Sequence, residues 1–279
     1  MGTSFKHPDV VDIPGAIYAS WKDLCSAVSF LTCLPVPSGT TAGRADDPVH
    51  AAEAAGFDVL RRASAFFSLV GAGIGLAAGL VLLGAFELGL HPLTCALIGL
   101  ATAAVLTRAL HEDGLADFAD GLGTFGTPER RLEVMRDSRI GTFGTLAVVF
   151  GVGIRASILS GLPSPDMAIG ALVAAGAASR AMLPVAMRWQ RPAREDGLAA
   201  GAGAPGWPQV ITAATLAFIA SLLAVGLWVS LGIGLAVTLA TLVTTVVAQR
   251  ALGGQTGDVL GAIQVVAETA ALAAVAMLI

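Results

Sequence analysis

The sequence predicts an all-α fold: a polytopic integral membrane helical bundle of about seven transmembrane helices, preceded by a short N-terminal interfacial or re-entrant helix. Three observations lead to this prediction. Hydrophobic residues make up 55% of the 279 residues, and the mean hydropathy is +0.78. Charged residues account for only 13%, whereas soluble domains contain about a quarter. The apolar residues also gather in runs long enough to cross a hydrocarbon core of about 30 Å.

We expect residues 1–63 to form an N-terminal segment and residues 64–279 to form the transmembrane catalytic domain. Residues 21–34 are apolar but only about 14 long, too short to span a bilayer, so they are expected to form the interfacial or re-entrant helix. Residues 38–60 are polar and are expected to form a cytoplasmic loop at the membrane surface. The N-terminus lacks a charged stretch followed by an apolar one, so no cleavable signal peptide is expected.

Hydropathy predicts seven spans. They run at about 64–90, 93–110, 142–161, 167–187, 210–229, 231–248 and 258–279. In the first span Gly71, Gly75 and Gly79 recur every four residues, a spacing that lets a neighbouring helix of the same chain or of a second copy approach closely. Between the second and third spans, Thr127-Pro128-Glu129 has the form of a helix N-cap and first turn, which predicts a short helix to about Asp137.

The basic residues give an independent prediction of the orientation. If the N-terminus is cytoplasmic, 14 of the 16 Lys and Arg residues lie in inside segments, and the other two, Arg155 and Arg180, lie within spans. The positive-inside rule is then satisfied, and the polar loops share the cytoplasmic side. The net charge of −4 gives no global basic field, so nucleic acid is not an expected partner. The apolar spans make the lipid bilayer the expected partner.

An acidic stripe follows directly on the second apolar run. Read as a helix, residues 108–121 place Asp113, Asp117 and Asp120 at i, i+4 and i+7, within about 60° on one face. Such like charges repel one another unless a cation lies between them, and carboxylates suit Mg²⁺ or Mn²⁺, often together with substrate phosphates. A solvated helix face is an equal alternative for an isolated stripe, but the position after an apolar run favours a metal site.

Three more polar stretches are expected on the same face. They are 135–141 with Arg136, Asp137 and Arg139, 188–197 with Arg194, and 252–258 with Asp258. Carboxylates for a metal beside planar, always-charged guanidinium groups are typical of phosphate or pyrophosphate chemistry.

Four ionisable residues have more ambiguous roles. His111 is interpreted equally well as a general base, a hydrogen-bond donor to phosphate or a structural histidine at a helix end. Arg155, Arg180 and Glu268 lie within spans, where charge is costly, so they are expected to face the protein interior and to pair. Glu268 forms either a structural ion pair with Arg180 or part of a polar cavity reaching in from the cytoplasmic site, and we slightly favour the cavity.

Residues 111–121, His-Glu-Asp-Gly-Leu-Ala-Asp-Phe-Ala-Asp-Gly, resemble the H-x-D-G-L-A-D-x-x-D-G motif of the bacterial cobalamin synthases, also called adenosylcobinamide-GDP ribazoletransferases. The similarity continues, in the expected order, in residues 30–37, 133–144, 193–198 and 253–262. Two departures concern helix shape and remove no carboxylate: Ser68 stands where the family usually has proline, and Arg108-Ala109 replace a pair of small residues.

The resemblance implies a transferase of cobalamin biosynthesis in the bacterial cytoplasmic (inner) membrane. Such an enzyme joins adenosylcobinamide-GDP to α-ribazole or its 5'-phosphate and releases GMP, with Mg²⁺, through attack of a ribose hydroxyl on the cobinamide-side phosphorus. The roles implied for this chain are Mg²⁺ binding by Asp113, Asp117 and Asp120, orientation of a second metal or proton acceptance by Asp137 or Asp258, phosphate binding by Arg136, Arg139 and Arg194, and assistance to the hydroxyl by His111. A homo-oligomer, or association with other enzymes of corrinoid assembly, is left open.

Two alternatives are considered. The acidic motif also resembles that of the CDP-alcohol phosphotransferases, but their full D-G-x-x-A-R sequence is missing here. An ion-coupled transporter using Asp113, Asp117 and Glu268 would be expected to place its acids near the bilayer midplane and often to show two similar halves. The carboxylates instead cluster at one predicted edge, and no internal repeat is evident.

Overall fold

The computed structural model describes residues 13–36, 48–194 and 201–279, and over these residues the protein is a helical bundle. The only β pairing among the described residues is an isolated bridge between Pro192 and Gln255. In chain order the elements are α1 (Ile13–Leu31), α2 (Pro48–Ala63), the 3₁₀ turn η1 (Ser64–Phe66), α3 (Phe67–Glu87), α4 (Pro92–Leu106), α5 (Leu110–Gly123), α6 (Pro128–Val134), α7 (Thr142–Ser160), α8 (Pro165–Trp189), α10 (Trp207–Val225), α11 (Leu227–Leu252) and α12 (Gly257–Leu278). The all-α prediction is confirmed.

Six helices of the described chain are long and apolar enough to cross a membrane. They are Gly56–Glu87, which joins the second half of α2 to η1 and α3, together with α7, α8, α10, α11 and α12. The pair α4 and α5 makes a seventh only if both helices are counted as one broken span. The expectation of about seven spans is therefore confirmed, and the second of them is unusual.

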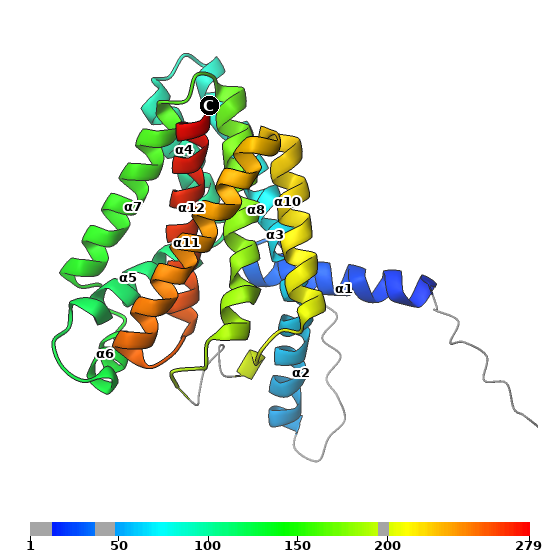
Figure 1. Cartoon of the computed structure of the whole chain (residues 1–279), viewed down its shortest axis with the longest axis vertical. Coiled ribbons are helices and arrows are strands. Elements are labelled where there is room, and N and C mark those ends of the chain that lie inside the picture. Colours follow the sequence, from blue (N-terminus) through cyan, green and yellow to red (C-terminus); the bar gives the residue numbers. More distant parts are fainter. Residues whose placement is uncertain (1–12, 37–47, 195–200) are drawn as a thin grey trace, which may run out of the picture.

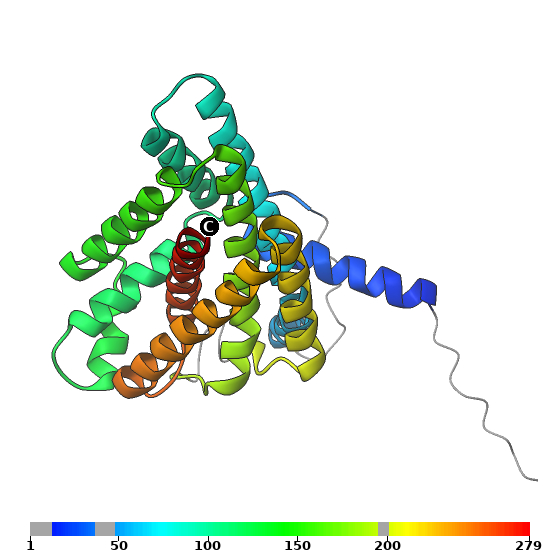
Figure 2. The same ribbon diagram turned by 45° about the horizontal axis from the view of Figure 1, so that its top comes forward.

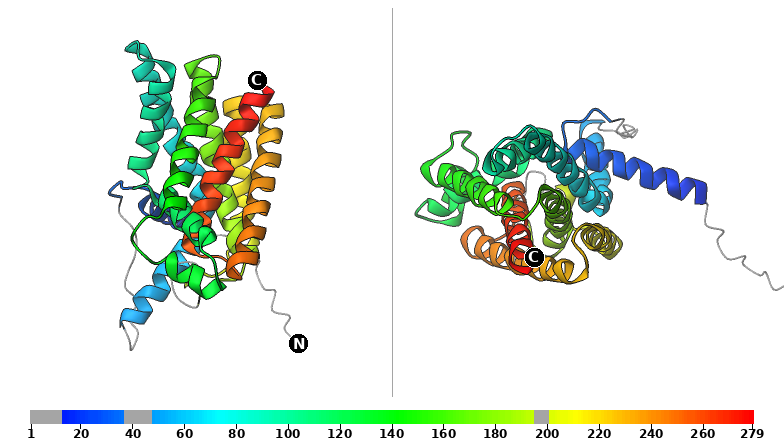
Figure 3. Two further views of the ribbon diagram at one scale, coloured as in Figure 1. Left: turned by 90° about the vertical axis from the view of Figure 1, so that its left-hand side faces the viewer. Right: turned by 90° about the horizontal axis from the view of Figure 1, so that it is seen from above.

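The bundle has two central helices and an outer ring (Figure 3). In α8 and α12, 72% and 67% of the most apolar window is buried inside the protein, whereas in α7 and α10 the value is 22%. The outer helices therefore present apolar side chains such as Phe150 and Leu223, which are 61% and 82% exposed, to the surroundings. In a water-soluble protein such a surface would cause association, whereas in a bilayer it contacts lipid.

The glycine series of α3 packs against α8 of the same chain. A Cβ atom on Gly71 or Gly75 would collide with the backbone carbonyl of Gly176 or Leu172. The two backbones can approach this closely only because the side chains are missing, as the small-residue spacing predicts.

The polar segments gather at one end of the bundle (Figure 1). The C-terminus and the short turns after α3, α7 and α10 lie at the other end. The end with α2, α6 and the segments 190–194, 201–206 and 253–256 is the one for which the sequence predicts a cytoplasmic location. We call it the polar end.

The N-terminal segment differs from its prediction in two ways. α1 begins at Ile13, eight residues before the expected position, and lies crosswise to the bundle, projecting beyond it (Figures 1 and 2). The polar loop expected at 38–60 is wrong from Pro48 onward, because α2 occupies residues 48–63. Its sequence is rich in alanine, the strongest helix former, so polarity alone did not indicate a loop. Residues 38–47 of the expected loop lie outside the described residues.

The second predicted span, 93–110, is not one straight helix. α4 ends at Leu106, and α5 begins at Leu110 at an angle of 91° to it. α5 therefore runs across the bundle at about the level of α1 (Figure 1). The short helix predicted from Thr127 is confirmed as α6, but it ends at Val134 instead of Asp137.

Candidate active site

α5 begins after a tight, nearly right-angled turn of the chain at Arg108 and Ala109. Their φ angles are 54° and 53°, in the left-handed region that residues other than glycine rarely adopt. This turn directs the acidic face of α5 toward α12 at the polar end. Glu112 and Asp113 lie in the first turn of α5, where the free N–H groups and the helix dipole stabilise negative charge.

α5 crosses α12 in close contact at two glycines. A Cβ atom on Gly114 would lie 2.9 Å from the carbonyl oxygen of Asp258 and 3.1 Å from Cα of Gly261. Any side chain at this crossing would push the helices apart. The two glycines therefore allow Asp113 and Asp117 of α5 to lie beside Asp258 in the first turn of α12, and we call these three residues the carboxylate cluster.

Thr256 fixes the start of α12 and its acidic residue. The Thr256 hydroxyl oxygen accepts a hydrogen bond from the backbone N–H of Val259 at 3.3 Å, as an N-cap does. The same hydroxyl donates to Oδ2 of Asp258 at 3.2 Å. The Asp258 carboxylate is thereby oriented before any ligand binds.

The carboxylate cluster has more negative than positive charge nearby. Burial, followed by the charges of Asp113, Asp258 and Asp120, raises the pKa of Asp117 to about 6, and only the Arg194 guanidinium opposes the shift. Asp117 lies in the crosswise helix α5, which is not one of the six helices that are long and apolar enough to cross a membrane. Since a carboxylate in such surroundings is stabilised by a cation, the cluster has the electrostatic character of a metal site.

Asp120, the third residue of the acidic stripe, joins α5 to the start of α7. Its two carboxylate oxygens accept hydrogen bonds from the backbone N–H groups of Gly141, at 2.6 Å, and Gly144, at 2.8 Å. A Cβ atom on either glycine would collide with this carboxylate. Asp120 therefore caps the N-terminus of α7, a contact between two motifs that the sequence pattern did not indicate.

Arg194 is brought to the cluster by a link between two loops. The backbone N–H of Ala193 donates to the carbonyl of Gln255 at 2.8 Å, and the N–H of Gln255 donates to the carbonyl of Arg191 at 2.9 Å. Nη2 of Arg194 then donates to the carbonyl of Leu132 at 2.8 Å. The expected convergence of these loops is thus present, although residues 195–197 of the same motif lie outside the described residues.

Asp137 and Arg139 pair with each other in the exposed loop after α6. Nε and Nη2 of Arg139 donate to the two carboxylate oxygens of Asp137 at 3.1 and 2.7 Å. This hydrogen bonding lowers the pKa of Asp137 to about 2. Asp137 is not among the groups that perturb the pKa of Asp117, and the neighbouring Arg136 is exposed as well. The loop therefore lies at the margin of the carboxylate cluster.

His111 is buried between the cluster and two arginines. Burial, together with the charges of Arg180 and Arg155, lowers the pKa of His111 well below its usual value, so its imidazole is neutral at pH 7. Its Nε2 atom has no hydrogen-bond partner among the described residues. A neutral imidazole with an unpaired nitrogen can accept or donate a hydrogen bond to a ligand.

The charged residues within the spans form a buried network, so their expected pairing is confirmed. Arg155 donates to Glu268 and to Glu112, each at 3.1 Å, and Arg180 lies 3.6 Å from the second oxygen of Glu268. The network matches the ion-pair interpretation of Glu268, extended to a second arginine, and not the polar cavity that we slightly favoured from the sequence. Sequence reasoning missed Glu112, although two arginines against one glutamate indicated that another carboxylate was needed.

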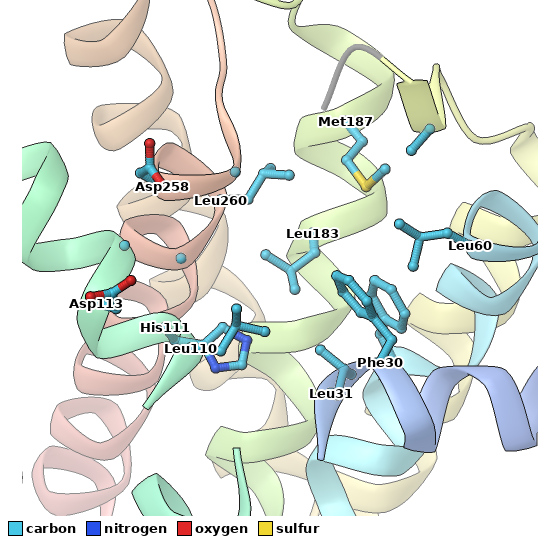
Figure 4. A pocket seen from close by; sticks show the side chains of 15 residues that line it. Phe30, Leu31, Leu60, Leu110, His111, Asp113, Leu183, Met187, Asp258 and Leu260 are labelled. Carbon is cyan, nitrogen blue, oxygen red and sulfur yellow. The ribbon is translucent and has the colours of Figure 1, made fainter. Parts of the chain in front are cut away.

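A cavity of about 150 Å³ opens beside the carboxylate cluster (Figure 4). Asp113 and Asp258 lie on one side, and Phe30, Leu31 and Leu60 lie on the opposite side. These three apolar residues belong to α1 and α2, so the N-terminal segment forms part of the site.

The cluster fits a hard divalent cation that is shared with a substrate. No group of three His, Cys, Asp or Glu side chains in the described chain is arranged as a ligand set of its own. Mg²⁺ usually binds through one or two carboxylates, waters and substrate phosphates, and Asp113, Asp117 and Asp258 supply oxygen donors of that kind.

Comparison with known proteins agrees with these features. Residues 23–276 match the family described as Cobalamin-5-phosphate synthase. The chain is 43% identical to the adenosylcobinamide-GDP ribazoletransferase of Azorhizobium caulinodans over 256 residues, covering 90% of this chain and 93% of that one. It is 43% identical to the protein of that name from Bradyrhizobium diazoefficiens over 87% of this chain and 88% of that one, and 37% identical to that from Brucella canis over 91% and 96%. No solved structure matches it. The chain therefore belongs to the cobalamin-5-phosphate synthase family.

Proposed function

We propose that this protein is an adenosylcobinamide-GDP ribazoletransferase. It joins adenosylcobinamide-GDP to α-ribazole or its 5'-phosphate, forms adenosylcobalamin or its 5'-phosphate, and releases GMP. The observation that supports this best is the carboxylate cluster, with Arg194 beside it, at the edge of a cavity in a chain that matches the ribazoletransferases over nearly its whole length.

The reaction is a displacement at phosphorus. The oxygen of a ribose hydroxyl forms a bond to the cobinamide-side phosphorus, the bond from that phosphorus to the bridging oxygen breaks, and GMP leaves with the bridging oxygen. The hydroxyl proton goes to a protein base or to the leaving phosphate. Catalysis of this kind depends on positioning and on neutralising charge at the phosphate oxygens.

The residues of the cluster divide these tasks. Asp113 and Asp117 would hold Mg²⁺, and the bound metal would neutralise charge on the pyrophosphate oxygens. Asp258, fixed by Thr256, accepts the hydroxyl proton, with His111 as a hydrogen-bond partner of the hydroxyl. Asp120, whose two carboxylate oxygens hold the start of α7, supports the metal site through its negative charge beside Asp117.

The arginines neutralise the phosphates, and Arg194 is the best placed of them because its charge already acts on Asp117. Arg136 and Arg139 lie in the loop at the margin and bind the guanosine-side phosphate, which leaves in GMP. Asp137 holds Arg139 in this arrangement, and its low pKa makes it a poor base.

We further propose that the polar end faces the cytoplasm from the inner membrane. Fourteen of the 16 basic residues lie in the segments predicted to be inside, which satisfies the positive-inside rule. The cluster's position at one end of the bundle, and not at its middle, favours an enzyme with water-soluble substrates over an ion-coupled transporter.

The test is GMP release by the purified, detergent-solubilised protein given both substrates and Mg²⁺. GMP should appear only when both substrates are present and should stop when the metal is chelated. Asp117→Asn should lower the rate at least about 100-fold, because it removes a charge from the cluster. Asp166→Asn is the matched control, since Asp166 is exposed in the first turn of α8 at the other end of the bundle.

Two results would contradict the proposal. The first is a folded wild-type protein that releases no GMP from these substrates. The second is release of CMP from a CDP-linked lipid precursor, which would indicate a CDP-alcohol phosphotransferase.

A further inference from the structure

The cavity beside the carboxylate cluster has two chemically different sides. Its acidic side consists of Asp113 and Asp258, with His111 next to them (Figure 4). Its apolar wall comes from four separate helices and consists of Phe30, Leu31, Leu60, Phe67, Leu183 and Met187. We call this second surface the apolar wall.

The apolar wall contains a pair of stacked rings. The centroids of Phe30 in α1 and Phe67 in α3 lie 5.8 Å apart, and their planes differ by 12°. Phe67 is only 2% exposed, so its position is fixed by the core, whereas Phe30 is partly buried. A stacked pair at the edge of a cavity can extend its stack to a flat ligand, and the sulfur of Met187 adds a polarisable contact.

One buried polar atom at this cavity has no protein partner. His111 is 3% exposed and lines the cavity, and its Nε2 is without a hydrogen bond among the described residues. An unsatisfied nitrogen of this kind costs free energy unless a ligand or water pairs with it. The atom marks the place where the polar part of a ligand begins, close to the acidic side.

The substrates of the proposed reaction contain four ring systems that could occupy the cavity: corrin, adenine, guanine and benzimidazole. A corrin ring is too large for this cavity of about 150 Å³, because pockets that enclose even drug-sized ligands measure about 300–1,000 Å³. Guanine, and equally the adenine of the adenosyl ligand, would leave donors and acceptors of the ring unpaired against the apolar wall, which is unfavourable. The benzimidazole ring of a ribazole is flat and apolar, and after ribosylation it has no N–H donor.

We propose that this cavity is the subsite for the aromatic ring of the ribazole nucleophile, an inference that rests on the proposed function. The ring packs against the apolar wall next to Phe30, and the ribose extends past His111. This arrangement brings the attacking hydroxyl to Asp258 and to the phosphorus held at the cluster. It also gives α1 a direct part in substrate binding.

The first experiment uses the wild-type protein with free benzimidazole as a probe. Benzimidazole should inhibit GMP release competitively with α-ribazole and should not compete with adenosylcobinamide-GDP. GMP, used as a second probe, should show the opposite pattern. Competition between benzimidazole and adenosylcobinamide-GDP would overturn the assignment.

The second experiment compares two phenylalanines that pack against the same core but differ in their relation to the cavity. Phe30 lines it, whereas Phe66 does not. Phe30→Leu should raise the KM for α-ribazole about three- to tenfold and leave the KM for adenosylcobinamide-GDP within twofold. Phe66→Leu should leave both within twofold. A rise only in the KM for adenosylcobinamide-GDP would contradict the proposal.

Direct binding separates this inference from the proposed reaction. Titration calorimetry of wild-type protein with α-ribazole should show binding that Phe30→Leu weakens by the same factor. If the wild type binds α-ribazole in this way but releases no GMP, the reaction is wrong and the ring subsite stands. If it releases GMP but Phe30→Leu changes neither the binding nor the KM, the subsite is wrong and the reaction stands.

Discussion

The crossing of α5 and α12 gives the sharpest prediction about the site. In Gly114→Ala the new Cβ would lie 2.9 Å from the carbonyl oxygen of Asp258, whereas ordinary contacts begin at 3.4 Å. The helices must therefore separate by about 0.5 Å, because the obstructing atoms belong to the backbone. Overpacking of this size costs about 1–3 kcal/mol of stability. It also displaces Asp113 and Asp117 from Asp258, and misplacements of about 1 Å cost about 100-fold in rate.

We expect Gly114→Ala to lower kcat for GMP release by about 10- to 100-fold while the protein still folds. The assay is GMP release at saturating substrate, together with thermal unfolding in detergent. Gly153→Ala is the matched control, since a Cβ on Gly153 of α7 meets nothing within 4 Å. That variant should keep full activity and gain up to about 1 kcal/mol from the better helix former. Wild-type activity in Gly114→Ala would refute the argument that close helix contact positions the carboxylates.

Three further predictions concern charge, backbone and pH. Glu268→Gln leaves Arg155 with an incomplete set of partners in the buried network and should cost about 3–5 kcal/mol in chemical unfolding; a loss below about 1 kcal/mol would mean that the network is solvated. Ala109→Gly relieves a left-handed φ of 53° and should raise stability by about 1 kcal/mol. A clear fall in the temperature of thermal unfolding would argue against the left-handed turn at this position. The pKa of Asp137 is lowered to about 2 by Arg139, so any stability from this pair is complete above the unfolded pKa of about 4 and is lost as the pH falls through about 2. The rate of Asp137→Asn relative to wild type should therefore stay constant between pH 5 and 8, and a ratio that changes over this range would show that Asp137 titrates there.

The sequence predicted the spans well because each is a long apolar run, and it predicted the convergence of Asp113, Asp117 and Asp258 through their motifs. It did not predict the sharp turn between α4 and α5. Arg108 and Ala109 adopt left-handed φ angles without the glycine or proline that usually marks such a turn, so hydropathy gave one straight span.

Other parts of the site depend on contacts that no local pattern encodes. The bonds from Asp120 to Gly141 and Gly144 join residues more than 20 positions apart. The pairing of Glu112 with Arg155 likewise depends on how α5 crosses α7. Counting the charges within the spans would have indicated that an acidic partner was missing, but not which residue supplied it.

The short helix α4 has a consequence for the surrounding lipid. At 15 residues it is about 22 Å long, well below the thickness of a typical hydrocarbon core, and the chain then turns aside into α5. We therefore expect the bilayer next to α4 to be locally thin, with headgroups and water drawn inward on the side where α5 lies. Such a deformation would let water-soluble nucleotides reach the carboxylates without entering hydrocarbon. Thickening the membrane with longer acyl chains opposes this deformation, so membrane thickness itself becomes a variable that acts on the enzyme.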